Sequence, residues 1–196
     1  MTGIPRGDHF VEEGLPAMVN PDASPEEEVA IVDEQNNVTG SASRAVMRRE
    51  GLIHRAVYIL VFNSGGRLFV QERSLTKDIF PGFRDLCAGG VVLAGESYEE
   101  SAARELEEEL GVRNASLETL FDFSGEYLGQ RVWGRAYSCT AEGPFALQPE
   151  EVAGGAFFSL DEVHRLIEQG SCTPDSVYVL RRHLKERETG LPGERI

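Results

Sequence analysis

The chain has 196 residues, of which 41% are hydrophobic and 27% are charged, so it can build an apolar core without disulfides. Its three cysteines lie far apart with no CxxC spacing, which argues against a zinc ribbon. A formal net charge of -14 excludes the basic face that a nucleic-acid-binding protein needs. It does not exclude a small-molecule diphosphate as partner, because divalent cations can lie between two anions.

The sequence shows no feature that directs it to a membrane. Its first ten residues lack the charged-then-apolar order of a signal peptide, and no apolar run is long enough to cross a bilayer. We therefore expect a cytoplasmic protein with reduced cysteines and no membrane partner.

Three parts are predicted along the chain. Residues 1–26 are rich in Gly, Pro, Asp and Glu and are expected to form a flexible acidic extension. Residues 27–188 are expected to form a single domain, followed by a tail over residues 189–196.

Apolar patterning and turn residues predict the elements of this domain in chain order. Strands are predicted over Glu28–Val32, Val38–Ala42, Ala56–Phe62, Arg67–Gln71, Ala115–Phe123, Arg131–Cys139 and Gly155–Phe158. Helices are predicted over Ser43–Glu50, from Ser97 to Gly111, from Ser159 to about Gln169 and from Thr173 to about Glu186. The elements do not alternate regularly, so an α+β fold is favoured over a doubly wound sheet. The hairpin formed by the first two strands is a candidate for pairing in a homodimer.

The helix after Ser97 carries the most informative pattern. Its small and aliphatic residues share one face, while Glu105, Glu108 and Glu109 follow the i, i+3, i+4 spacing that brings side chains together on another face. Three adjacent carboxylates repel one another, and hard divalent cations such as Mg²⁺ are their natural partner. A solvated acidic surface is the alternative interpretation.

The surrounding segment resembles the Nudix box, G-x5-E-x7-R-E-U-x-E-E-x-G-U, in which U is an aliphatic residue. Every fixed position is filled at the required spacing. The matching residues are Gly90, Glu96, Arg104, Glu105, Leu106, Glu108, Glu109, Gly111 and Val112. The predicted hairpin, glycine-rich loop and helix around them also fit the structural context of this motif.

This resemblance implies a Nudix fold, an α/β/α sandwich around a mixed sheet. It also implies a Mg²⁺-dependent pyrophosphohydrolase, with Mn²⁺ as a substitute, in which metal-activated water cleaves a nucleoside diphosphate linked to another moiety or a related small diphosphate. By the family pattern, the metal ligands are Glu105, Glu108, Glu109 and the carbonyl of Gly90. Arg104 would orient these acids.

The general base lies outside the motif in some members of this family. Glu151 stands just before a late predicted strand and is the candidate for that role, although an acidic loop residue can equally serve solubility. Glu109 could act in its place.

The chain also resembles the isopentenyl-diphosphate-isomerase-like branch of the Nudix proteins. The residues that carry this resemblance are His54-Arg55-Ala56, Arg73 to Lys77 and Phe80-Pro-Gly82. Arg73 and Lys77 match positions that bind the diphosphate in the isomerases, although surface charges at a strand end are an equally simple interpretation.

Isomerase activity is the main alternative to hydrolysis. The isomerase needs a cysteine and a histidine where this chain has Gly89 and Val91, and a late glutamate pair where it has Gln130 and Val132. His54 matches one isomerase metal ligand but stands alone. A non-catalytic Nudix-like ligand sensor is a further alternative, which losses among the acids of the motif would indicate. None is lost, so the sequence favours the hydrolase.

Overall fold

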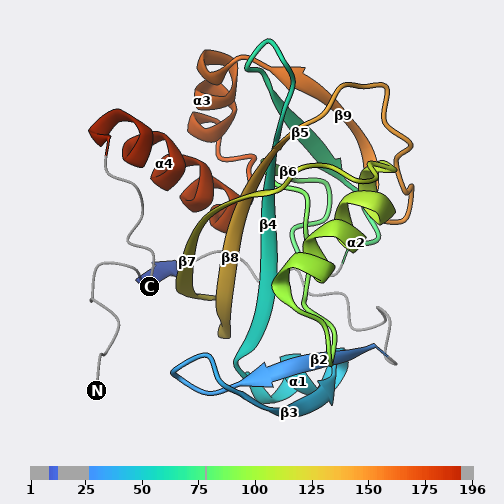
Figure 1. Cartoon of the computed structure of the whole chain (residues 1–196), viewed down its shortest axis with the longest axis vertical. Helices are drawn as coiled ribbons and strands as arrows, with labels where there is room; N and C mark the ends of the chain where they lie inside the picture. Colours follow the sequence, from blue (N-terminus) through green and yellow to red (C-terminus); the bar gives the residue numbers. More distant parts are fainter. Residues whose placement is uncertain (1–8, 13–26, 78, 191–196) are drawn as a thin grey trace.

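The computed structural model describes residues 9–12, 27–77 and 79–190, over which nine strands and four helices form (Figure 1). The strands are β1 (His9–Glu12), β2 (Glu28–Val32), β3 (Val38–Ser43), β4 (His54–Phe62), β5 (Leu68–Arg73), β6 (Arg84–Asp85), β7 (Glu118–Tyr127), β8 (Gln130–Thr140) and β9 (Val152–Phe158). The helices are α1 (Arg44–Glu50), α2 (Tyr98–Leu110), α3 (Leu160–Glu168) and α4 (Pro174–Thr189).

One mixed sheet runs through the molecule in the order β1-β7-β8-β4-β2-β3. Its centre is the parallel pair of β4 and β8, which aligns His54 with Val132 and Phe62 with Thr140. At Phe62 the chain turns into β5, which leaves β4 and pairs with β6 and β9 instead. The strands β5, β6 and β9 lie beside the end of α2, the helix that carries the acidic motif (Figure 1).

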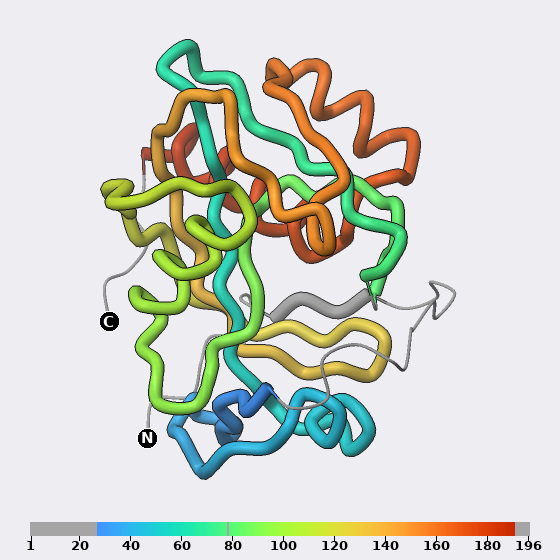
Figure 2. Tube along the Cα trace, turned by 90° about the vertical axis from the view of Figure 1, so that its right-hand side faces the viewer, coloured from blue at the N-terminus to red at the C-terminus, as the bar shows by residue number. Residues whose placement is uncertain are grey.

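Helices cover both faces of the sheet, as Figures 1 and 2 show. Alternate residues of β4 point to opposite faces, so Ile59 lies in the apolar cluster with α2 whereas Leu60 lies in the cluster with α3 and α4. The fold is therefore the predicted α+β class, with helix, sheet and helix as its three layers. The sheet therefore separates the α2 side of the molecule, which carries the acids, from the α4 side.

The segment before α2 runs antiparallel along β4 without forming a regular strand. Ala88 and Gly90 accept hydrogen bonds from Ile59 and Val57 of β4, at 2.7 and 2.9 Å. The helix then begins at Ser97, whose side chain accepts from the N–H of Glu100 in the predicted capping box. The carbonyl of Gly90 and the first turns of α2 are thus fixed to the centre of the sheet.

The structure extends several predicted elements and adds two strands, β1 and β6. β7 continues to Tyr127, and α4 ends at Thr189, one residue beyond the predicted domain limit. Within the predicted extension, His9–Glu12 forms β1 and pairs parallel with β7, a non-local contact that no local pattern in residues 1–26 indicates. The described part of the chain leaves out residues 1–8, 13–26, 78 and 191–196, which include most of the predicted extension.

Beyond β2, the outermost strand of the described sheet is β3. Its hydrophobic residue Val38 is 57% exposed. Pairing of this hairpin with a second subunit stays a prediction. No helix in the described ranges is long and apolar enough to span a membrane.

Candidate active site

The three glutamates of the acidic motif, Glu105, Glu108 and Glu109, lie on one side of α2 but differ in exposure. Glu109 is 5% exposed, the Glu105 side chain is 12% exposed, and the Glu108 side chain is half exposed at 50%. The two inner carboxylates therefore face the sheet, while Glu108 lies at the mouth of the site.

Arg104 links these acids to the loop that precedes α2. Its guanidinium donates to Glu96 at 2.9 Å, to Glu105 at 2.8 Å and to Glu108 at 2.9 Å. Glu96 in turn accepts from the N–H of Leu93 at 3.2 Å. One cation thus contacts the loop and two of the three acids, and the orienting role of Arg104 stays a prediction.

The inner carboxylates are electrostatically unbalanced. Burial, followed by the charge of Glu109, raises the pKa of Glu105 to about 7. Burial also raises the pKa of Glu109, against the opposing effect of Lys77. Arg104 offsets only part of this repulsion, so a further positive charge beside the two carboxylates would favour their ionised forms.

Two adjacent glycines shape the floor of the site. A Cβ on Gly90 would lie 2.5 Å from Oε1 of Glu105, so the missing side chain makes the space that this carboxylate occupies. Gly89 has a φ of +145°, and a Cβ there would lie 2.1 Å from the carbonyl oxygen of Val57. Its N–H donates to Oε2 of Glu109 at 3.1 Å. Glycine at position 90 leaves room for the Glu105 carboxylate, and glycine at position 89 avoids a clash with the carbonyl of Val57.

These residues fit a hard divalent cation by their chemistry. Carboxylate oxygens of Glu105, Glu108 and Glu109 and the carbonyl of Gly90 are the donor type that Mg²⁺ and Mn²⁺ prefer. In the described ranges no three acidic, histidine or cysteine side chains are gathered as a metal cluster. Glu108 contacts Arg104 through its Oε2, and Glu109 contacts Gly89 through its Oε2.

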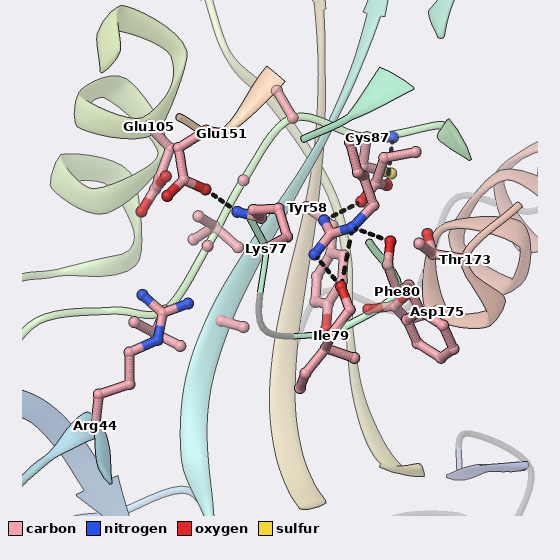
Figure 3. Close-up of a pocket in the computed structure, with 18 of the residues that line it drawn as sticks. Arg44, Tyr58, Lys77, Ile79, Phe80, Cys87, Glu105, Glu151, Thr173 and Asp175 are labelled. Atoms are coloured by element: carbon pink, nitrogen blue, oxygen red, sulfur yellow. Dashed lines mark hydrogen bonds and ion pairs between the residues drawn. The ribbon is translucent and has the colours of Figure 1, made fainter. Parts of the chain in front are cut away.

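A cavity of about 540 Å³ opens beside these acids, a size suited to a small ligand (Figure 3). Glu105, Glu108 and Gly90 line one wall, and Glu151 lies beside them. Other lining residues come from α1, β4, the loop after β5 and the start of α4, and they include Arg44, Arg48, His54, Tyr58, Arg73, Lys77, Phe80, Asp85, Cys87, Tyr127, Thr173 and Asp175.

Lys77 and Glu151, predicted separately as a phosphate ligand and a base, are in direct contact. Nζ of Lys77 pairs with Oε2 of Glu151 within the cavity (Figure 3). Burial, followed by the charge of Arg73, lowers the pKa of Lys77. The structure thus brings both predicted residues to the same wall as Glu105.

Arg73 has a different environment from the one predicted. Its guanidinium donates to the carbonyls of Ile79 and Phe80, at 2.7 and 3.2 Å, and to Asp85 at 3.0 Å. Arg73 therefore holds the loop that forms one side of the cavity, and its direct contact with a diphosphate stays a prediction.

Arg44 lies in the cavity, although it was not among the predicted site residues. Its guanidinium points toward the Lys77 side (Figure 3) and pairs with Glu27 at 3.0 Å. Its buried Nε has no hydrogen-bond partner among the residues that the structure describes. The available signal was the spacing of Arg44 and Arg48, which places both on one face of a short helix. The packing of that helix against the site could not be read from the sequence.

The residues relevant to isomerisation are not arranged for that reaction. Cys87 is 5% exposed, and burial raises the pKa of its thiol well above the ordinary value. His54 is 4% exposed, and burial lowers its pKa to about 4. The cavity end near α4 also contains Asp85 and Asp175, which suit a polar group better than a hydrocarbon chain.

The model of the NUDIX domain matches residues 52–177, which include β4, the glycine loop, α2 and the cavity wall at Glu151. The chain belongs to the Nudix family. It is an enzyme of the hydrolase type that acts on phosphorus anhydrides, in agreement with the complete Nudix box.

Relatives from bacteria carry the same family name. The chain is 45% identical over 166 residues to an uncharacterized Nudix hydrolase of Pseudomonas aeruginosa, covering 83% of this chain and 96% of that protein. It is 43% identical over 157 residues to the uncharacterized Nudix hydrolase YfcD of Escherichia coli, covering 80% and 86%.

Solved structures of other proteins have a similar fold. DR0079 from Deinococcus radiodurans superimposes with a TM-score of 0.70 at 27% identity, over 80% of this chain and 98% of that one. The NUDIX domain of Shewanella oneidensis NrtR, solved with ADP ribose, gives a TM-score of 0.54 at 16% identity, over 69% and 86%. The second likeness shows the fold alone.

Proposed function

We propose that this enzyme is a Mg²⁺-dependent pyrophosphohydrolase that cleaves a nucleoside diphosphate linked to another moiety, or a related small diphosphate. The observation that carries this proposal is geometric: the carboxylates of Glu105 and Glu109 are buried beside the Gly89-Gly90 loop, and Glu105 and Gly90 line a ligand-sized cavity. ADP ribose, named with the NrtR structure, is one compound of this class.

In this proposal the α2 residues hold the metal. Glu105, Glu108, Glu109 and the carbonyl of Gly90 would bind the cation, while Arg104 orients Glu105 and keeps the preceding loop against the helix. When bound, such a cation neutralises the diphosphate and lowers the pKa of a coordinated water. Mn²⁺ would substitute for Mg²⁺ on this donor set.

The cationic residues of the cavity that lie near these acids would bind the phosphates. Lys77 and Arg44 supply positive charge there, and a phosphate oxygen offers Lys77 an alternative to its pairing with Glu151. Glu151, once released, can accept the proton of the attacking water, a role for which Glu109 is the alternative.

The test is a panel of diphosphates assayed with Mg²⁺, with Mn²⁺ and with EDTA. It includes isopentenyl diphosphate, with the product identified by NMR. We expect metal-dependent cleavage of one class of diphosphate and no isomerisation. Isomerised product, or tight metal-dependent binding without cleavage, would contradict the proposal and favour the isomerase or the sensor.

Glu109→Gln tests the metal assignment in the same assay. The substitution keeps the shape of the side chain and removes its charge. Replacing a residue that only supports a metal ligand typically lowers metal affinity or activity roughly 10- to 100-fold. Replacing the ligand Glu109 itself should lower turnover by more than that. Because it also removes a repulsion that acts on Glu105, the variant without metal should unfold at the same temperature or higher. Turnover equal to that of the unsubstituted enzyme would remove Glu109 from the site.

A further inference from the structure

A buried amide outside the Nudix box contacts the innermost acid of the site. Gln71 on β5 is 3% exposed, and its Nε2 donates to Oε2 of Glu109 at 3.1 Å. The N–H of Gly89 donates to the same oxygen at 3.1 Å. We propose that Gln71 is a positioning residue that, together with Gly89, holds the Glu109 carboxylate in the orientation that binds a divalent cation. This inference rests on the proposed function, which makes Glu109 a metal ligand.

The place of Gln71 on its strand is one where an apolar residue would be the ordinary choice. Side chains alternate along β5, so Gln71 points to the same face as Phe69, which packs in the apolar cluster beneath α2. A buried amide at such a position is unfavourable unless it is hydrogen-bonded. Its bond to Glu109 satisfies one donor and ties β5 to the helix that carries the acids.

The two donors fix one oxygen of Glu109 and leave the other. In the described part of the chain the hydrogen bonds of this carboxylate go to Oε2, so Oε1 is the oxygen left for a cation. Both donors are neutral groups, which orient the carboxylate without cancelling its charge. Arg104, by contrast, brings a full positive charge to Glu105 and Glu108.

Both donors also lie on elements that cannot easily shift. Gly89 is held between Ala88 and Gly90, whose carbonyls bond to β4. Gln71 lies opposite Asp85 of β6 and Gly155 of β9 in the sheet. A carboxylate held by two rigid elements is positioned before the cation arrives, which favours binding.

The test measures Mn²⁺ binding to the full chain without substrate, by electron paramagnetic resonance of unbound Mn²⁺. Gln71→Met keeps the length and burial of the side chain but cannot donate, and we expect the Kd for Mn²⁺ to rise roughly 10- to 100-fold. Gln71→Asn, whose amide is too short to reach Glu109, should show a similar loss and decides the test if Gln71→Met does not fold. Circular dichroism and thermal unfolding in EDTA establish folding.

Ser138→Ala is the matched control. It removes another buried side-chain hydrogen bond of the sheet, from Ser138 to Glu118 at 3.4 Å, away from the acids. Its Kd for Mn²⁺ should equal that of the unsubstituted protein. In turnover assays, the Gln71 variants should need more Mg²⁺ for half-maximal rate, while the KM for the diphosphate at saturating Mg²⁺ stays unchanged.

An unchanged Kd for Mn²⁺ in a folded Gln71 variant overturns the inference, and so does the absence of Mn²⁺ binding by the unsubstituted protein. Because this measurement needs no turnover, it separates the inference from the reaction. Weakened Mn²⁺ binding in the variants, in a protein that cleaves no diphosphate, would support the positioning role and contradict the proposed hydrolysis.

Discussion

Lys77 is one of two lysines in the chain, and its ammonium lies inside the cavity against Glu151. If it binds a phosphate, Lys77→Met should raise the KM for the diphosphate roughly 10- to 100-fold, the range expected for one lost hydrogen bond to a charged group. The other lysine, Lys185, is exposed on α4, so Lys185→Met is the control and should leave KM unchanged. Steady-state kinetics at saturating Mg²⁺ make the comparison, and equal KM values for both variants would exclude Lys77 from substrate binding.

His54 makes stability depend on pH in a defined window. Burial lowers its pKa to about 4 from an ordinary value of 6.5, so between these pH values the unfolded chain binds more protons at this residue than the folded chain does. Stability linked to neutral His54 is therefore present above pH 6.5 and is lost as pH falls toward 4. His54→Gln carries no such proton, and its unfolding temperature should decline less over this window. Parallel profiles for the two proteins would contradict the assignment.

At the scale of elements, the loop along β4 controls where the Glu105 carboxylate can lie. A methyl group at Gly90 would meet the end of this flexible side chain, not backbone, so Gly90→Ala should fold normally and displace the carboxylate. We expect turnover to fall about 10-fold or more and the Mg²⁺ requirement to rise. Gly40→Ala is the control, because a Cβ on Gly40 meets nothing within 4 Å.

Local patterns predicted the elements whose limits are set locally. Ser97, Glu100 and Gly111 define both ends of α2 by capping, and the spacing of its glutamates follows from the helix itself. Arg104 likewise contacts Glu108 one turn away. These features were therefore visible in the sequence.

Features that depend on contacts between distant segments were not predictable in this way. Gln71 contacts Glu109, 38 residues further along the chain, and nothing near either residue marks the pair. The hydrogen bonds from Arg73 to the carbonyls of the loop that folds back over it were likewise not marked by any local pattern, and its predicted contact with a phosphate stays a prediction. β1 similarly depends on pairing with β7.

For the whole molecule, divalent cations should stabilise the fold more at high pH than at low pH. Metal ligands must lose their protons to bind, and the pKa of Glu105 without metal is about 7, raised first by burial. Mg²⁺ should therefore increase the unfolding temperature more at pH 8 than at pH 6, and EDTA should reverse the effect. Glu109→Gln is the control and should show little increase at either pH. An equal increase at both pH values would contradict this linkage.

The parallel pair of β4 and β8 also has a consequence for the order of folding. It joins His54 to Val132, and all of α2 lies in the chain between these strands. Closing so long a loop is slow compared with forming a helix or a hairpin, so α2 can coil before the sheet that supports it exists. During synthesis, the apolar cluster beneath α2 is complete only after β8, which supplies Tyr137 and Cys139 to it, has left the ribosome. The complete acidic site is therefore a late product of folding.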